Sequence, residues 1–479
     1  MLQLGQNYVL CLRTLDILQK EGATGMTIKV VKFGGSSLAD SLQVGKAIAI
    51  VKADPTRTHV VVSAPGKRNA LDTKVTDLLL GWYRLKKQGV YEEAAQLWTA
   101  ICNRYFEIIS GLDLGLDLRD DFAAIQDAQE AGASEDFIAS RGEYLMAKIM
   151  ADALDYEFVD AAKCVRFNSI KTASGHLATH DRLYNEGLTH SLVYSLMHDK
   201  RVVMPGFYGT LLDGKTIQIF PRNSSDISGA IVAAALQANV YEKFTDVPGI
   251  LAADNRLVKN PRSITSATYR ELGELAIDPS GVFHPEAMYP VQTAGVETHI
   301  LDANNPREKG TVIYPDIRAP SLTPGTVIGI AARAGFSIIT VYKVAMNREV
   351  GFVRRVLEVL EHERISFEHA PMGRDIMNVL LETSQLKDKE DYIVNRLISF
   401  CFADEVKIED SLALISTVGR AMRDTAGVAA RLFTALANHG ISNRIIDQGA
   451  TEMNIVVGVK ESDLKPAVNA IYKEFFPSA

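Results

Sequence analysis

Short apolar runs alternate with longer amphipathic stretches between Ile28 and about Pro315. The stretch 41–53 has hydrophobic residues at helical spacing, and residues 70–155 are predicted to be mostly helical. Strands that alternate with helices favour a mainly parallel sheet with helices on both faces. The first part of the chain is therefore predicted to have an α/β fold.

Polar or small residues follow the predicted strands of this sheet. The strands are predicted over residues 28–33, 59–63 and 201–204, and a turn is predicted at 245–249. Ligands of such sheets bind at the carboxyl ends of the strands. The residues at these ends, which we expect to converge, are Lys32, Ser63, Phe207 and Thr245.

The chain repeats itself after a proline-rich linker at residues 316–324. The pairs at constant offset are Gly351 with Gly427, Leu357 with Phe433, Leu360 with Leu436, Ile365 with Ile441 and Met377 with Met453. Each repeat is predicted to contain a strand, a glycine, an amphipathic helix and two further strands. Neither repeat holds a nucleophile–base pair or a set of metal ligands, so the module is predicted to be regulatory or purely a dimerisation module.

Composition excludes several classes of function. The chain has 479 residues, of which 47% are hydrophobic and 23% charged, as expected for a globular protein of several domains. A net charge of −7 argues against nucleic acid and anionic membranes as partners. No apolar run approaches the ~20 residues of a membrane span. The cysteines form no C-x-x-C pair, which argues against a disulfide framework or zinc site and fits a reducing cytoplasm; they are Cys11, Cys102, Cys164 and Cys401.

The N-terminal segment, residues 1–26, lacks the features of a signal peptide. Met26 stands directly before the first predicted strand, and Lys20-Glu21-Gly22 can be encoded by AAGGAGG, which reads as a bacterial ribosome-binding site. We hypothesise that Met26 is the true start and that the preceding residues are a translated leader. The alternative is a short amphipathic extension that packs on the body of the protein, and the intact mass of the native protein would separate the two.

The first predicted strand ends in Lys32-Phe33-Gly34-Gly35-Ser36-Ser37 and is followed by a predicted helix. Two glycines let the backbone approach a ligand closely, and their N–H groups with a helix N-terminus behind them favour an anion. Lys32 adds a positive charge, so the segment is predicted to hold phosphate. The alternative is an ordinary tight turn whose glycines serve packing.

Three further clusters follow this segment. They are Ser63-Ala64-Pro65-Gly66 with Thr76, Ser140-Arg141-Gly142-Glu143 opening a helix, and Pro221-Arg222-Asn223-Ser224-Ser225-Asp226. Together with Gly206-Phe207 and Thr245-Asp246-Val247-Pro248-Gly249-Ile250, they stand in the order found in aspartate kinases (aspartokinases) of the amino-acid kinase family. The chain resembles that family from about Thr27 onward, and the repeat resembles its tandem ACT domains at residues 427–433 and 448–452.

This resemblance implies the domain organisation and the reaction. An amino-acid kinase domain is expected over residues 27–315, followed by α+β ferredoxin-like ACT domains over 325–400 and 401–479. The implied reaction is phosphoryl transfer from ATP, with Mg²⁺, to the side-chain carboxylate of L-aspartate, which is the first step of lysine, threonine and methionine synthesis. The implied assembly is a homodimer or larger, and the implied enzyme is monofunctional because no homoserine dehydrogenase region follows.

The resemblance also implies roles for individual residues. Lys32 bridges the transferred phosphoryl group, and Asp226 orients Lys32 or helps to place the metal–nucleotide. The implied substrate contacts are Arg222 to the α-carboxylate, Glu143 to the ammonium group, and Thr76, Ser225 and Phe207. The implied nucleotide contacts are Lys32, Gly34, Gly35, Ser36, Ser63, Ala64, Thr245, Asp246 and Arg256, and no metal-binding side chain is implied.

Simpler interpretations exist for three of these residues. Glu143 can be a charge at a helix N-terminus, Thr76 a helix cap, and Arg222 a member of a surface ion pair.

For the ACT region, the resemblance implies an effector site that involves Met346, Glu349, Gly351, Phe352 and Glu368. The effector is expected to be lysine, threonine or both. Glu349 is larger than the serine that lysine-binding relatives often have.

The chain departs from the family pattern in two segments. The family usually has G-R-G-G-S-D where this chain has residues 221–226, and a lysine is often found where this chain has Gly281 before His284. These departures motivate the alternative of a catalytically weakened, amino-acid-sensing paralogue. A kinase for another amino acid, such as glutamate or acetylglutamate, is disfavoured by the ACT region.

Overall fold

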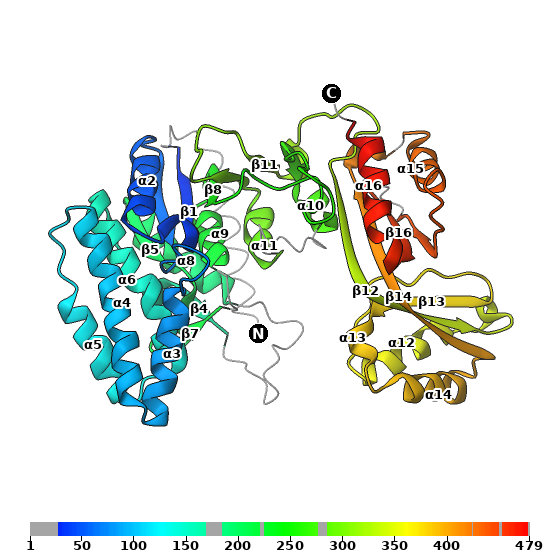
Figure 1. Cartoon of the computed structure of the whole chain (residues 1–479), viewed down its shortest axis with the longest axis horizontal. Coiled ribbons are helices and arrows are strands. Elements are labelled where there is room, and N and C mark those ends of the chain that lie inside the picture. The colour runs from blue at the N-terminus through cyan, green and yellow to red at the C-terminus, as the bar shows by residue number, and fades with distance from the viewer. Residues whose placement is uncertain are drawn as a thin grey trace, which may run out of the picture.

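The computed structural model describes residues 27–168, 184–220, 225–275, 285–423, 425–449 and 453–477. These residues form two lobes that lie side by side along the longest axis of the molecule (Figure 1). The N-terminal lobe holds the large sheet, and the C-terminal lobe holds the repeat. The hypothesis about a leader concerns residues 1–26, which lie outside the described residues.

An eight-stranded sheet forms the centre of the N-terminal lobe, with the strand order β3-β5-β2-β1-β8-β10-β11-β9. All its neighbouring strands pair in parallel except β10 and β11. The strands are β1 (Lys29–Phe33), β2 (Arg57–Val62), β3 (Glu157–Phe158), β5 (Val202–Pro205), β8 (Val240–Thr245), β9 (Ser266–Thr268), β10 (Glu297–Asp302) and β11 (Thr311–Tyr314). The predicted α/β fold with a mainly parallel sheet is confirmed.

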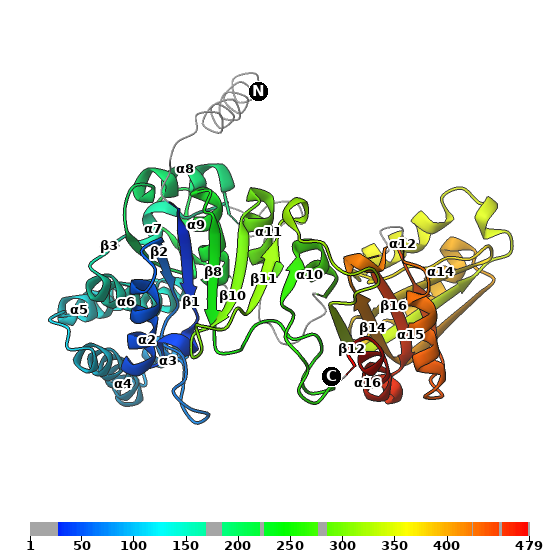
Figure 2. The same ribbon diagram turned by 90° about the horizontal axis from the view of Figure 1, so that it is seen from above.

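Helices cover both faces of this sheet, whose strands lie side by side in Figure 2. One face packs on α2 (Ser41–Lys52), α3 (Val75–Gln88), α4 (Tyr91–Gly111), α5 (Arg119–Glu130) and α6 (Glu135–Leu154). The other packs on α7 (Ala161–Cys164), α8 (Glu186–Met197), α9 (Ser225–Ala235), α10 (Tyr269–Leu275) and α11 (Pro285–Ala294), beside a small sheet of β4 (Arg166–Phe167), β6 (Tyr208–Leu211) and β7 (Ile217–Ile219).

Alternation along β1 determines which side chains meet which helices. Val31 and Phe33 lie in the core beneath α2 and α4, whereas Val30 lies in the core beneath α9. Successive side chains of a strand point to opposite faces. Lys32 therefore points toward the same helix as Val30, and this places its ammonium group at the start of α9.

The C-terminal lobe contains one continuous five-stranded sheet of order β13-β12-β14-β16-β15. Its strands are β12 (Gly329–Tyr342), β13 (Ile376–Glu382), β14 (Glu405–Val418), β15 (Ile445–Asp447) and β16 (Asn454–Lys460). Its helices are α12 (Phe352–His362), α13 (Thr383–Leu386), α14 (Glu390–Cys401), α15 (Val428–Ala437) and α16 (Leu464–Phe475).

Two long strands, β12 and β14, run through both repeat units. Residues 336–342 of β12 pair with 405–412 of β14 beside α12 and α14, whereas residues 329–334 pair with 413–418 beside α15 and α16. Gly335 and Ser411, both at positive φ, lie where the units meet. The division into ACT domains over 325–400 and 401–479 stays a prediction. Residues 329–334, although early in the lobe, pack with the unit that contains α15 and α16.

The sequence repeat is visible in matching helix starts. Gly351 precedes α12 at φ +82°, and Gly427 precedes α15 at φ +91°. Glycine enters this left-handed region at little cost, whereas other residues are strained there. The two glycines were conspicuous in the sequence because each unit needs the same turn at the same place.

A buried ion pair joins the two lobes. Glu271 on α10 is fully buried, and its carboxylate pairs with the Arg420 guanidinium and accepts a 2.7 Å hydrogen bond from the Arg420 backbone N–H. Arg420 also donates to the carbonyl of Pro320 at 2.7 Å. Ile330 N–H donates to Ala252 O at 2.8 Å, so the second repeat unit is hydrogen-bonded to the loop that follows β8.

Replacing Arg420 with alanine should lower the thermal melting midpoint, because it leaves the Glu271 carboxylate buried without its cation. The loss from breaking such a pair is about 3 kcal/mol. Arg431→Ala is the matched control: Arg431 pairs with Glu474 with its side chain 49% exposed, and such pairs contribute about 0–1 kcal/mol. Equal melting midpoints for the two variants in differential scanning fluorimetry would contradict a structural role for the Glu271–Arg420 pair.

Among the helices that the structure describes, none has the length and apolarity needed to cross a membrane.

Candidate active site

The carboxyl ends of four adjacent strands meet at one edge of the large sheet. In the strand order β5-β2-β1-β8, these ends carry Phe207, Ser63, Lys32 and Thr245. The predicted convergence is confirmed. The helix α9 begins at Ser225. Asp226, in its first turn, therefore lies beside Lys32 at this edge.

Two lysines share one buried carboxylate at this edge. Lys32 Nζ lies 2.5 Å from Asp226 Oδ1, and Lys243 Nζ pairs with Asp226 Oδ2. The side chains are 5%, 6% and 7% exposed for Lys32, Lys243 and Asp226, respectively. Burial raises the pKa of Asp226, but the charges of Lys243 and Lys32 outweigh it and hold the pKa at about 2. Asp226 is therefore ionised and holds both ammonium groups.

Lys243 was missed by the analysis of the sequence. It lies on β8 opposite Lys32 on β1, and the two strands pair in parallel in that register. The sequence does contain a signal for it, namely a lysine near the end of an otherwise buried strand. Lys32 is predicted from the same pattern.

The glycine turn after β1 is held by backbone contacts. Gly34 N–H donates to Phe244 O at 3.3 Å, and Gly66 N–H donates to Gly35 O at 2.8 Å. A Cβ on Gly35 would lie 3.0 Å from Ala64 O. The glycines are thus needed for the close approach of this turn to the loop after β2 and to the end of β8.

The helix expected directly behind the glycines is not an α-helix. Residues Gly35–Leu38 form a short 3₁₀ turn, and α2 begins only at Ser41. The Asp40 carboxylate caps α2 by accepting from Gln43 N–H at 2.9 Å. The N-terminus of α2 is therefore satisfied by its own side chain, and the helix-dipole part of the prediction was wrong.

Alanine at position 66 should disturb this turn. Its Cβ would lie 2.6 Å from Gly35 C and 2.7 Å from Gly35 O, so the backbone of one loop must move. Displacing a positioning element by ~1 Å can cost ~10²-fold in rate, and we expect such a loss in kcat/KM for the nucleotide. Gly115→Ala is the control, because nothing lies within 4 Å of the added Cβ. Steady-state kinetics of the two variants test this, and a fully active Gly66→Ala enzyme would contradict it.

Glu143 lies in the interior of α6 with its side chain in the site. The helix begins at Glu135, where the Ser134 hydroxyl caps it, so the expectation that Ser140 opens a helix was wrong. Glu143 is 5% exposed and lies well beyond the first turn, which excludes the helix N-terminal interpretation. Burial raises its pKa to about 7, against a hydrogen bond from Ala64 N–H and the charges of Lys32 and Arg141. In the described part of the chain, Glu143 Oε2 has no hydrogen-bond partner.

Other predicted substrate residues line the same edge. Ser63 Oγ and Ser225 Oγ lie 2.6 Å apart and are both buried. Phe207 has φ +78°, and its N–H donates to Ser228 Oγ at 3.0 Å. A non-glycine residue in this region is strained, as is frequent at functional sites. Thr76 lies in the first turn of α3 and does not cap it, since Lys74 is the capping position.

Comparison with known proteins agrees with this geometry. The profile of the Amino acid kinase family matches residues 27–302, and that of the ACT domain matches residues 415–475. The chain is 39% identical over 459 residues to Aspartokinase 3 of Bacillus subtilis, covering 94% of this chain and 99% of that one. This chain belongs to the aspartokinase family. The sequence-based identification as an aspartate kinase is confirmed.

Solved aspartokinases have the same fold. The aspartate kinase of Clostridium acetobutylicum is 38% identical, with a TM-score of 0.81 over 94% of this chain and all of that chain. Escherichia coli aspartokinase III, solved with aspartate and ADP, has a TM-score of 0.70 at 24% identity, over 94% of this chain and 100% of that chain. The predicted amino-acid kinase fold followed by an ACT region is confirmed.

Most residues expected to contact the nucleotide lie on segments that follow the strand ends at this edge of the aspartokinase. Ser36 is exposed on the 3₁₀ turn, and Thr245 Oγ1 lies 3.3 Å from the exposed Asp246 carboxylate. Ala64 donates its N–H to Glu143. The Arg256 side chain is 67% exposed and pairs with Asp254 at 2.6 Å. Arg256 lies in the loop after β8, and this ion pair with Asp254 does not link it to the sheet edge. The roles of all these residues as nucleotide contacts stay predictions.

Two predicted segments fall outside the described residues. Arg222 belongs to residues 221–224, and Gly281 and His284 belong to residues 276–284. The role of Arg222 stays a prediction.

Four of the five predicted effector residues cluster at the start of α12. Met346 and Phe352 are buried, and Glu349 pairs with Arg355 and with Lys343, the latter at 3.3 Å. Gly351 supplies the turn described above. Glu368 lies apart from them, since it pairs at 2.8 Å with Arg333 of β12, ten residues before Lys343.

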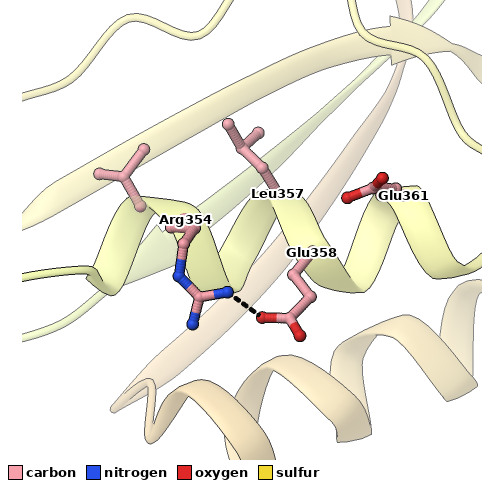
Figure 3. A pocket seen from close by; sticks show the side chains of 5 residues that line it. Arg354, Leu357, Glu358 and Glu361 are labelled. Carbon is pink, nitrogen blue, oxygen red and sulfur yellow. Dashed lines mark hydrogen bonds and ion pairs between the residues drawn. The ribbon is translucent and has the colours of Figure 1, made fainter.

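A surface hollow of the C-terminal lobe lies on α12, away from the sheet edge (Figure 3). Side chains of one helix line it, including Leu357 and Glu361, and Arg354 binds Glu358 across one turn at 2.8 Å. Such a pair is typical of a solvated helix face. This hollow does not contain any residue of the candidate active site.

Proposed function

We propose that this aspartokinase transfers the γ-phosphoryl group of ATP to the side-chain carboxylate of L-aspartate at the carboxyl edge of the sheet, giving 4-phospho-L-aspartate and ADP. The observation that carries the proposal is the buried Lys32–Asp226 pair beside the glycine turn and Glu143. The Lys32 ammonium suits a phosphoryl group, and the glycine turn suits the phosphoryl oxygens. The buried Glu143 carboxylate suits an ammonium group.

The nucleophile requires no general base. A side-chain carboxylate is already ionised near neutral pH. Catalysis then depends on positioning two anions in line and on neutralising the charge that develops between them. Lys32 supplies that charge, and Gly35 offers a backbone N–H group. Gly34 shapes the turn, since its own N–H donates to Phe244 O.

The substrate's own charges match the remaining residues. Glu143 receives the α-ammonium group, which supplies a partner for its buried oxygen. Arg222 receives the α-carboxylate through a two-pronged hydrogen bond. Thr76, Ser225 and Phe207 complete the pocket around the substrate.

The residues present fit MgATP. A Cβ would fill the narrow approach at Gly35, which leaves a backbone cradle for phosphate oxygens. In the described ranges there is no group of three His, Cys, Asp or Glu side chains suited to a metal ion. Mg²⁺ is commonly held by nucleotide phosphates with one or two carboxylates, so we assign its binding chiefly to the phosphates of ATP.

Regulation by an amino acid is proposed for the C-terminal lobe. An E. coli relative, 25% identical over 94% of this chain, is named lysine-sensitive aspartokinase 3, and its structure has been solved with lysine and aspartate. We propose lysine as the effector, threonine as the alternative, and a homodimer or larger assembly as the regulated form. The reaction would then start the synthesis of lysine, threonine and methionine under feedback control.

Aspartyl-hydroxamate formation tests the proposal. Purified protein with ATP and Mg²⁺ should form hydroxamate only when aspartate is present, and lysine or threonine should suppress it. Absence of product would overturn the proposed activity. Absence of product with a lysine-dependent thermal shift would instead support the second candidate, a catalytically weakened sensor, which the non-glycine residues at 223 and 224 motivate.

A further inference from the structure

A second lysine reaches the phosphoryl site from the neighbouring strand. Lys32 and Lys243 lie opposite each other on β1 and β8, whose backbones are about 4.8 Å apart in a sheet. Both point to the face covered by α9, because Val30 and Tyr241, two positions earlier on each strand, lie in the core beneath that helix.

Asp226 holds the two lysines in equivalent positions. Each of its carboxylate oxygens faces one ammonium group, and the Tyr241 hydroxyl donates to Asp226 O at 3.1 Å. A Cβ at Gly229 would lie 2.6 Å from that hydroxyl, so the glycine lets α9 pack closely on β8. The packing therefore fixes the carboxylate between the lysines.

Lys243 also borders the glycine turn. The next residue, Phe244, accepts the hydrogen bond from Gly34 N–H. A Cβ on Gly34 would lie 3.7 Å from both Lys32 Nζ and Phe244 O. The end of β8 and the end of β1 thus form two sides of one anion cradle.

The charges of this cluster do not balance. Three buried cations, Lys32, Lys243 and Arg141, lie near two buried carboxylates, Asp226 and Glu143. The nearby Asp246 is exposed to solvent. Buried charge is costly unless it is paired. An entering polyanion would supply the missing negative charge where water is largely excluded, and there its attraction to each lysine is strong.

We propose that Lys243 is a second cation for the transferred phosphoryl group, acting together with Lys32, and that Asp226 is the positioning residue for both. This inference rests on the proposed phosphoryl transfer. An aspartate carboxylate oxygen forms a bond to the γ-phosphorus while the bond from that phosphorus to the β,γ-bridging oxygen breaks, and the electron pair leaves with ADP. Neither lysine transfers a proton in this step, and their ammonium groups neutralise charge on the oxygens.

The test compares Lys243→Met, Lys243→Arg and Lys29→Met. Lys29 is the matched control, since it is a partly buried, ion-paired lysine at the opposite end of β1. Lys243→Met still leaves Lys32 to pair with Asp226, so it is expected to fold. We expect its kcat to fall by ~10²–10³-fold, as for the loss of one preorganised donor. KM for aspartate should change by less than about 3-fold, because the ammonium and α-carboxylate contacts remain.

Nucleotide binding separates a phosphoryl contact from a structural role. We would measure the Kd values of Mg·ADP and of the non-hydrolysable analogue Mg·AMPPNP by calorimetry. Lys243→Met should raise the Kd of Mg·AMPPNP by about 10-fold or more and leave the Kd of Mg·ADP nearly unchanged, since only AMPPNP has a γ-phosphoryl group. Lys243→Arg should regain part of both the rate and the AMPPNP affinity, and Lys29→Met should match the wild type.

Two results would overturn the inference. One is a Lys243→Met enzyme with wild-type kcat and an unchanged preference for AMPPNP over ADP. The other is an equal loss of affinity for both nucleotides together with a lower melting midpoint, which would make Lys243 structural. If Lys243→Met does not fold, Lys243→Arg decides by the same nucleotide comparison. If the wild type binds nucleotide but shows no aspartate-dependent transfer, the proposed function fails, while the AMPPNP comparison still tests Lys243.

Discussion

Replacing Asp226 with asparagine should nearly abolish turnover and lower stability at the same time. The amide cannot neutralise Lys32 and Lys243, so both buried ammonium groups would lose the carboxylate with which they pair. Breaking a buried ion pair in this way costs about 3–5 kcal/mol, and we expect kcat to fall by ~10³-fold as both lysines lose their positions. Steady-state kinetics and thermal melting measure the two effects.

The control for this variant is Asp54→Asn. Asp54 pairs with Lys29 at the far end of the same strands, and its side chain is 26% exposed. It should show a small loss of stability and unchanged kcat. ATP should restore part of the melting midpoint of Asp226→Asn, because phosphates supply negative charge to the lysines. Near-normal turnover of the Asp226→Asn enzyme would contradict the proposed role of Asp226 in positioning the two lysines.

The same residue predicts an acid limit of stability. The pKa of Asp226 is lowered from its ordinary value of 3.8 to about 2, so its stabilising contribution is complete above pH 4 and is lost as the pH falls through about 2.

Replacing Glu143 with glutamine should chiefly weaken aspartate binding. A hydrogen bond to a charged group contributes about 1.5–3 kcal/mol, so KM for aspartate should rise by about 10- to 100-fold while KM for ATP changes little. In the wild type, KM for aspartate should also rise as the pH falls below about 7, because protonation neutralises Glu143. That pH dependence should disappear in Glu143→Gln.

The ionised Glu143 carboxylate should strengthen aspartate binding but lower the stability of the free protein. The pKa of Glu143 is raised from 4.5 to about 7, so its contribution is complete below pH 4.5 and is lost as the pH rises through about 7. At pH 8 the free Glu143→Gln protein should therefore melt at or above the wild-type temperature. Glu135→Gln, on the exposed first turn of the same helix, should leave KM unchanged. A Glu143→Gln enzyme with wild-type KM at every pH would contradict the ammonium contact.

Strand ends and helix-start glycines could be predicted because they depend on local rules. Lys32 follows from an apolar run that stops at two glycines, and Gly351 and Gly427 follow from a repeat whose turns need positive φ. These features are determined by a few neighbouring residues. Their positions in the structure agree with the prediction for that reason.

Features that depend on distant partners could not be predicted in the same way. The proposed role of Lys243 depends on its position opposite Lys32 in the sheet, and no local sequence pattern determines that register. The start of α6 was misplaced because Ser134 caps it nine residues before Glu143, outside the segment whose residues drew attention. Likewise, the division of the repeat at 400/401 follows the internal similarity, whereas the pairing of β12 with β14 joins residues from both units.

This shared pairing has a consequence for the order in which the lobe is synthesised and folds. The strand β12 leaves the ribosome long before β14, which forms its main ladder from Gly329–Val418 to Tyr342–Glu405. Until then one edge of β12 is open, and open edges recruit other chains. A fragment that stops near residue 400 would keep that edge permanently. Such a truncation should therefore aggregate during expression, and a usable regulatory fragment must extend through β16 and α16.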